Sequence, residues 1–228
     1  MTTAAWADIT GKISGFVKDP SGYSYSGNGL VFWPNGDAYD GDIVAGRREG
    51  KGLFVWFNGQ RYRGEWKGDL PNGPGVLEFP DGARYEGPVV DGVPQGAGVY
   101  TWPNGQRLVG IWRDGEARGV ADIRMPDGSL YHGDVSAGKP NGSGQLKFAS
   151  GEQYVGSFKD GLAHGEGVYT WKNGDTYQGS WRLGAKEGPG VYTWANGDRW
   201  QGIYASDHQL EGELVRAGDK SLGPAHGQ

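Results

Sequence analysis

Aromatic residues and glycines alternate along the chain in a pattern that returns every 23 residues. A tyrosine, or a residue in its place, is followed two positions later by glycine at eight starting points: Tyr39, Tyr62, Tyr85, Leu108, Tyr131, Tyr154, Tyr177 and Trp200. A period of this length is typical of stacked arrays, in which each unit contacts only its neighbours. Function is therefore expected on a long surface.

Each unit is predicted to contain a hairpin, because a turn signature precedes the Tyr-x-Gly segment. Trp-Pro-Asn-Gly occurs twice, and Phe-Pro-Asp-Gly and Met-Pro-Asp-Gly occur once each. Proline at the second turn position and glycine at the fourth favour a type I turn closed by a glycine bulge. Trp102 is expected to pair with Gln106 across one such loop, which places Tyr100 opposite Leu108.

This register predicts two different faces. One face carries the aromatic side chains together with the glycines, which leave room for neighbouring rings to lie over the backbone. The other face carries valine, threonine and charged side chains. Glycine is abundant, at 45 residues, and aromatic residues make up 13% of the chain, whereas methionine occurs only twice. This composition suits turns and strands better than helices with a leucine-rich core.

One copy shows the full order of the repeat: Tyr177-x-Gly179-x-Trp181, Gly184, Gly188-x-Gly190, a hydrophobic run and Asn196-Gly197. This order resembles the MORN (membrane occupation and recognition nexus) repeat. Seven such repeats are predicted over 39–199, with starts at residues 39, 62, 85, 108, 131, 154 and 177. The other predicted parts are an N-terminal segment (1–12), an atypical repeat (13–38), a degenerate C-terminal capping repeat (200–216) and a flexible tail (217–228).

We therefore predict an all-β fold, an elongated, single-layer, twisted antiparallel sheet of stacked 23-residue β-hairpin repeats. The resemblance implies that the sheet also curves, so that the aromatic face becomes a groove. The repeat at 108–130 departs from the pattern, with Leu108 in place of tyrosine and Ala121 in place of glycine. A local bend and neutral drift both remain open as explanations.

Catalytic chemistry is not indicated. The four histidines occupy unrelated repeat positions, and no nucleophile elbow, zinc-protease motif or phosphate-binding loop occurs. No cysteine is present, which excludes disulfides and thiolate metal sites. We predict no catalytic residue, cofactor or metal, and no enzymatic activity. No apolar run is long enough to span a bilayer and no signal peptide is recognisable, so a cytoplasmic location is expected. The resemblance adds peripheral attachment to a membrane or the cytoskeleton.

The resemblance implies a scaffold that binds a helical or extended segment of a partner protein along the aromatic groove. Packing of the rings on one another as core is an alternative role for most of them. The candidate groove residues are Trp33, Tyr39, Trp56, Tyr62, Trp66, Tyr85, Tyr100, Trp102, Trp112, Tyr131, Tyr154, Phe158, Tyr169, Trp171, Tyr177, Trp181, Tyr192 and Trp194.

Two alternatives stay open. The first is a phospholipid or membrane-surface module, for which Arg47, Arg48 and Lys51 form the densest basic cluster. A net charge of −5 and the absence of larger basic clusters disfavour it. The same balance disfavours nucleic acid as a partner. The second alternative is self-assembly into a homodimer through terminal repeats.

Overall fold

The computed structural model of the chain describes residues 26–218. The predicted N-terminal segment, residues 13–25 of the atypical repeat and residues 219–228 of the predicted tail lie outside the described residues. Within the described part the elements are strands and turns, and no helix occurs that could cross a membrane.

The chain divides into two compact units, with the boundary between Arg118 and Gly119. This boundary falls inside strand β10 and inside the divergent repeat at 108–130. The strands of the first unit are β1 (Gly27–Phe32), β2 (Ala38–Val44), β3 (Arg47–Val55), β4 (Arg61–Lys67), β5 (Leu70–Glu78), β6 (Arg84–Val90), β7 (Val93–Pro94), β8 (Gly96–Thr101) and β9 (Arg107–Arg113). The strand that contains the boundary is β10 (Glu116–Arg124).

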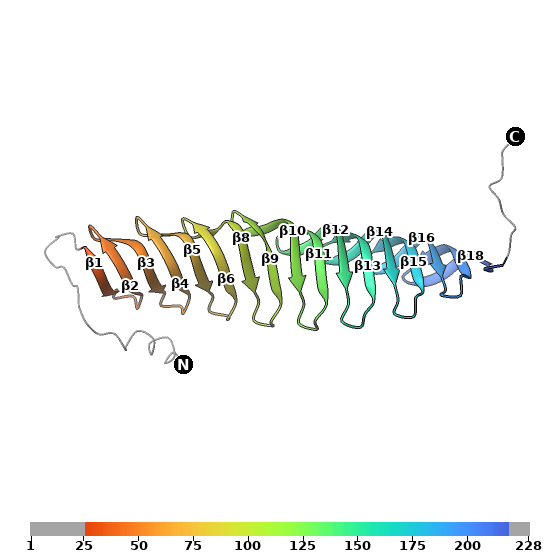
Figure 1. Cartoon of the computed structure of the whole chain (residues 1–228), viewed down its shortest axis with the longest axis horizontal. Helices are drawn as coiled ribbons and strands as arrows, with labels where there is room; N and C mark the ends of the chain where they lie inside the picture. The colour runs from red at the N-terminus through yellow and green to blue at the C-terminus, as the bar shows by residue number, and fades with distance from the viewer. Residues whose placement is uncertain (1–25, 219–228) are drawn as a thin grey trace, which may run out of the picture. The chain divides into compact units, whose positions relative to one another are not determined.

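The strands of the second unit that follow are β11 (Leu130–Ser136), β12 (Lys139–Lys147), β13 (Gln153–Lys159), β14 (Leu162–Thr170), β15 (Thr176–Arg182), β16 (Ala185–Thr193), β17 (Arg199–Ala205) and β18 (His208–Val215). Within each unit the strands pair antiparallel in chain order, with β6 pairing to both β7 and β8. The predicted all-β class of antiparallel hairpin repeats is confirmed. Figure 1 shows neighbouring strands of each unit joined by turns at alternating edges.

The long turns have the predicted form. The amide of Trp102 donates to the carbonyl of Gln106 at 2.9 Å, and Gly105 closes the loop with φ +87°. This conformation is costly for any residue with a Cβ atom, which explains the glycine. The predicted register is confirmed as well, since Tyr100 lies opposite Leu108. Each long turn therefore joins the last strand of one repeat to the Tyr-x-Gly strand of the next.

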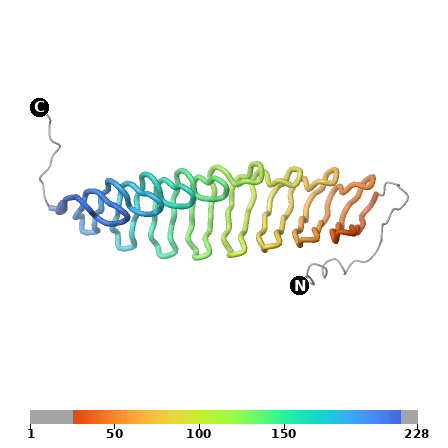
Figure 2. Tube along the Cα trace, turned by 180° about the vertical axis from the view of Figure 1, so that it is seen from behind, coloured from red at the N-terminus to blue at the C-terminus, as the bar shows by residue number. Residues whose placement is uncertain are grey.

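A second set of turns was not predicted. The Tyr-x-Gly strand returns through a two-residue turn whose two residues both have positive φ, such as Asp91 at 50° and Gly92 at 83°. Positive φ at both positions is the type I′ geometry that matches the twist of paired strands. These short turns lie at the opposite edge of each unit from the long turns, as the tube in Figure 2 shows.

The core is built on one face, which we call the aromatic face. Tyr62, Tyr85 and their equivalents are fully buried over the glycines of their own hairpins. A Cβ atom at Gly98 would come within 2.6 Å of the Tyr85 ring. The aromatic residue that ends each Tyr-x-Gly-x-aromatic segment packs edge-on against two tyrosines, as Trp181 does against those at 154 and 177, with both centroid distances 5.2 Å. Successive repeats are held together by these T-shaped contacts.

Candidate partner-binding site

The structure separates the candidate groove residues into two sets. Ten of them are buried parts of the core: Tyr39, Tyr62, Trp66, Tyr85, Trp112, Tyr131, Tyr154, Phe158, Tyr177 and Trp181. Eight are exposed or half-buried: Trp33, Trp56, Tyr100, Trp102, Tyr169, Trp171, Tyr192 and Trp194. The second set comes from the strand that precedes each long turn. Only this second set offers ring surface that another molecule could contact.

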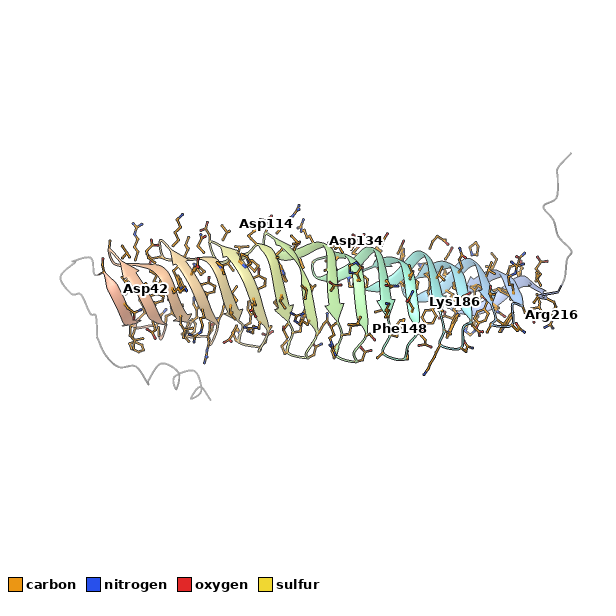
Figure 3. The ribbon with its side chains drawn as sticks, viewed as in Figure 1. Asp42, Asp114, Asp134, Phe148, Lys186 and Arg216 are labelled. Carbon is orange, nitrogen blue, oxygen red and sulfur yellow. The ribbon has the colours of Figure 1, made fainter. Side chains whose placement is uncertain are left out.

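Five half-buried rings of the second unit form a continuous row, which we call the aromatic ladder. Its successive centroid distances are 5.7, 4.6, 5.0 and 5.0 Å. In order, the ladder consists of Phe148, Tyr169, Trp171, Tyr192 and Trp194. Figure 3 shows Phe148 near the edge of the sheet that the long turns form. Mutual packing fixes the rings in place before any ligand arrives, which lowers the entropic cost of binding.

The first unit carries two shorter rows of the same kind. Trp33, Phe54 and Trp56 are linked by centroid distances of 5.4 and 4.6 Å. In the second row, the ring centroid of Tyr100 lies 6.0 Å from that of Phe79 and 4.6 Å from that of Trp102. Leu77 stands at the tyrosine position of the intervening strand, so the row of rings is interrupted there. The ladder of the second unit is the longer surface.

Sequence reasoning missed Phe148 and Phe79 as members of this surface. Both lie at the repeat position of Trp171, one and four repeats earlier in the chain. The 23-residue spacing alone would have found them, because residues at the same position of successive repeats face the same side of the sheet. Met125 occupies the equivalent position in the divergent repeat.

The tryptophans differ in their hydrogen bonding, but not strictly by set, since the buried indole N–H of the core residue Trp112 also meets no acceptor among the described residues. The indole N–H groups of the core residues Trp66 and Trp181 donate to the carbonyls of Gly52 and Gly167, each at 3.2 Å. Within residues 26–218, the indole N–H groups of Trp171 and Trp194 meet no acceptor. The ladder therefore offers unused donors beside its apolar rings.

Carboxylates line the long turns next to the ladder. Asp175 accepts the hydroxyl of Tyr192 at 2.6 Å and the backbone N–H of Ala195 at 2.9 Å. The bond from Tyr192, followed by that from Ala195, holds the pKa of Asp175 below its usual range. Burial, with Glu152 nearby, raises the pKa of Tyr169 to about 12. Asp175 is thus ionised and Tyr169 is neutral at physiological pH.

Two cations lie over buried or half-buried rings of the aromatic face. Lys186 Nζ is 5.4 Å from the centroid of Trp171 and 3.8 Å from an Asp207 carboxylate oxygen. In the first unit, the Arg48 guanidinium lies 4.6 Å from the centroid of Trp66 and bonds Asp69 through its Nε at 3.2 Å. Cation–π contacts of this kind tie the aromatic face to the neighbouring short turn.

The three residues expected to contact lipid, Arg47, Arg48 and Lys51, do not lie on one face of the sheet. Arg48 packs on the aromatic face, whereas Lys51 lies across from Glu65 on the other face and beside Asp42. Arg47 is exposed at the start of β3. The three residues therefore do not present one basic surface in the structure.

Basic residues on the opposite face of the first unit are interleaved with carboxylates. Glu78 lies between Arg61 and Arg84 in the cross-strand row, and Arg84 also pairs with Glu86 at 2.7 Å. These groups surround a shallow hollow lined by Leu53, Arg61, Arg63, Val76, Glu78 and Arg84. The carboxylates offset much of the positive charge of this row.

The MORN repeat model matches the chain at residues 39–61, 62–84, 85–107, 131–153, 154–176 and 177–199. The chain belongs to the MORN repeat family. The matched repeats have the boundaries expected from the sequence, and the model leaves 108–130 unmatched, where Leu108 and Ala121 replace the tyrosine and a glycine.

Solved structures with related folds include the G-box domain of the microcephaly protein CPAP, for which a role in centriole elongation is suggested. It shares 15% identity over 83% of this chain and 98% of its own, with a TM-score of 0.50. The TCP domain of Drosophila melanogaster SAS-4, in complex with a proline-rich motif of Ana2, shares 14% identity over 75% and 98%, with a TM-score of 0.42. The TCP10 domain of Danio rerio CPAP, in complex with a STIL peptide, shares 16% over 82% and 91%, with a TM-score of 0.36.

At 15% identity the likeness to the G-box domain concerns the fold alone. No curated protein is significantly similar to the chain. In the described part of these MORN repeats, no group of three or more His, Asp or Glu side chains is placed to hold a metal ion. His132 makes one exposed contact, with Asp122 at 2.8 Å, and His226 lies outside the described residues.

Proposed function

We propose that this MORN-repeat protein is a non-enzymatic scaffold, and that it binds a segment of a partner protein along the half-buried rings of its aromatic face. One observation carries the proposal. The repeats already have a buried core from the tyrosine, its glycines and the residue four positions after the tyrosine, which is aromatic and packed between two tyrosines at Trp66, Phe158 and Trp181. The rings before the long turns pack on this core, as Tyr169 does on Trp181 at a centroid distance of 6.2 Å, and they leave part of their surface exposed.

Such surface suits a partner segment. Tryptophan and tyrosine are enriched in the residues that dominate protein interfaces, because their large rings bury much area at a small entropic cost. Trp171 and Trp194 each combine an apolar ring with an unused donor. A scaffold role also agrees with membership of the MORN repeat family.

The proposal is tested by comparing proteins retained from a native lysate by three forms of the chain. The forms are wild type, the double variant Trp171→Ser with Trp194→Ser, and a control, Val155→Ser, on the opposite face. Val155 is 42% exposed, so its replacement leaves the aromatic face intact. We expect a retained protein that is lost only with the double variant, and that binds the purified wild type directly. Identical retention by all three forms would reject the aromatic face as the partner site.

A further inference from the structure

The aromatic ladder has a fixed spacing that limits which partner conformation can follow it. Phe148, Trp171 and Trp194 occupy the same position in three successive repeats. Each repeat contributes two strands, so these positions recur about every 9.6 Å across the sheet. A segment that lies along the ladder must present a side chain to the sheet at nearly this interval.

The polyproline II helix meets this condition most closely. It has three residues per turn and a rise of about 3.1 Å, so every third residue faces the same side after about 9.3 Å. An extended strand returns a side chain to the same face after about 6.6 Å. Two turns of an α-helix advance about 10.8 Å. Over the ladder the polyproline II mismatch is about 0.3 Å per repeat, against about 1 Å or more for the others.

The hydrogen-bonding groups of the ladder also fit this conformation. A polyproline II segment makes no internal hydrogen bonds, so its carbonyl oxygens are open to outside donors. Trp171 and Trp194 supply such donors, because neither indole N–H has an acceptor among the described residues. An α-helix would present its own satisfied backbone to these donors and leave them unused.

The charge around the ladder selects a basic segment. Four successive long turns of the second unit each carry one carboxylate. Glu152, Asp175 and Asp198 recur at the same interval as the rings, and Asp127 lies two positions earlier in its own turn. On the side of the ladder, three cations lie near these turns: Lys172, Lys186, which lies over Trp171, and Arg216, which is paired with Asp198 at 2.9 Å. The four carboxylates therefore exceed these cations by one charge.

We propose that the aromatic ladder binds a proline-rich segment with interspersed lysine or arginine, in the polyproline II conformation, with one turn of the ligand on each repeat. This inference rests on the proposed function and specifies the partner. The proline rings of every third residue pack on Phe148, Trp171 and Trp194, and the indole N–H groups donate to the ligand carbonyls. The basic side chains face the accessible carboxylates of the long turns, Asp127 and Glu152, because Asp175 is buried and Asp198 is paired with Arg216.

The test uses labelled synthetic peptides and fluorescence anisotropy. The probe is a peptide of four Pro-Pro-Lys triplets. The comparison peptides are four Ala-Ala-Lys triplets, with the same charge, four Pro-Pro-Glu triplets, with the same conformation, and an amphipathic helix with the same number of lysines. Wild-type protein is expected to bind the probe at least about tenfold more tightly than each comparison peptide, which corresponds to about 1.4 kcal/mol.

Variants locate the binding. Trp171→Ala and Trp194→Ala should each weaken probe binding about tenfold or more, whereas Trp171→Phe, which keeps a ring and loses the N–H, should have a smaller effect of about threefold. Phe57→Ala is the matched control, because Phe57 is 71% exposed and belongs to the first unit, which contributes no ring to the ladder. It should leave affinity unchanged. Circular dichroism on every variant establishes that the sheet is retained.

Other outcomes overturn the inference in distinguishable ways. Equal binding of the Ala-Ala-Lys peptide would reduce the interaction to charge. Tighter binding of the helical peptide, lost in Trp171→Ala, would reject polyproline II while leaving the proposed protein-binding face in place. Absence of probe binding, or probe binding that no ladder variant changes, would reject the ladder as a proline-rich site.

Discussion

The hydroxyl of Tyr62 donates a hydrogen bond to the carbonyl oxygen of Glu65, 3.0 Å away, at the point where the register between β4 and β5 shifts. Glu65 has no partner residue in β5, so the tyrosine compensates for the irregularity within its own strand. The same bond links Tyr154 to Ser157 at 3.0 Å and Tyr177 to Ser180 at 3.2 Å. A phenylalanine at these positions could fill the space but could not supply the donor.

Burial of these phenols predicts a defined loss of stability at high pH. Burial, with the Glu65 charge nearby, raises the pKa of Tyr62 from 10.0 to about 12, and burial raises that of Tyr85 to about 12. The folded state therefore holds these protons more tightly than the unfolded state. The stabilisation is complete below pH 10 and is lost as pH rises towards 12. Tyrosinate absorbance and circular dichroism are followed together as the pH is raised. The absorbance from the buried tyrosines should rise only at the pH at which circular dichroism shows that the sheet unfolds. Ionisation of all tyrosines near pH 10 in a folded sheet would contradict this.

The close contact between tyrosine and glycine predicts a specific double-mutant result. Gly98→Ala should lower the free energy of unfolding by about 1–3 kcal/mol, because the new methyl group overlaps the Tyr85 ring. Tyr85→Leu removes the ring and creates space for the methyl group. The loss of unfolding free energy in the double variant should therefore be smaller than the sum of the losses in the two single variants. The repeat at 108–130 carries Leu and Ala at the equivalent sequence positions. Denaturant unfolding of the four forms measures the coupling, and strict additivity would show that the overlap is relieved elsewhere.

The strand register and the two faces follow from residue types with narrow backbone preferences. Proline before Asn-Gly or Asp-Gly fixes the long turns, and these fix which residues face each other. The short turns escaped prediction because Leu183 and Ala45 have positive φ, which side chains of this kind rarely adopt. Asp91-Gly92 carries a recognisable signal, and it could have been read.

Residue type alone could not predict which rings are buried in the core and which remain exposed. Trp181 and Trp194 are both tryptophans, yet Trp181 is buried between two tyrosines, whereas Trp194 is half-buried at the start of a long turn. Their difference depends on whether rings of the neighbouring repeat cover them. From the sequence, Arg48 is likewise expected to be a surface charge, whereas the structure places its guanidinium over the rings of Trp33, Phe54 and Trp66.

Leu183 is a site where stability can be increased. It is 64% exposed and has φ +51° in a short turn, which is unfavourable for leucine. Leu183→Asn should raise the free energy of unfolding by about 0.5–1 kcal/mol, because asparagine tolerates the left-handed region. The matched control is Leu130→Asn, at an exposed position within β11. Equal shifts of the denaturant midpoint in both variants would indicate a general effect of polarity rather than relief of backbone strain.

Substitutions at two tryptophans should distinguish a core role from a partner-binding role. Trp181→Ala should cost about 3–5 kcal/mol of stability, as for other buried aromatic residues. Trp171→Ala should cost about half as much or less, because its ring is only half-buried. Partner binding should instead weaken by about 1–4 kcal/mol in the Trp171 variant. Thermal unfolding and affinity measured on the same samples distinguish the two roles, and unchanged affinity in Trp171→Ala would place the partner elsewhere.

The basic cluster at the start of β3 should contribute little to membrane binding. Each lysine or arginine close to an anionic surface contributes about 1 kcal/mol, and this attraction weakens as salt rises. Since Arg48 is held over Trp66 and bonded to Asp69, only Arg47 and Lys51 remain for lipid. We expect weak binding to vesicles that contain phosphatidylserine, with little change in the double variant Arg47→Ala with Lys51→Ala.

The variant Arg48→Met separates folding from lipid contact at this cluster. It keeps an apolar chain over the rings and loses the bonds to Asp69, so it should lower stability by about 1–3 kcal/mol without altering vesicle binding. Vesicle sedimentation at low and moderate salt provides the measurement. Tight binding that disappears with salt and with the Arg47 and Lys51 changes would instead support the membrane alternative, because only a surface charge interaction combines those two sensitivities.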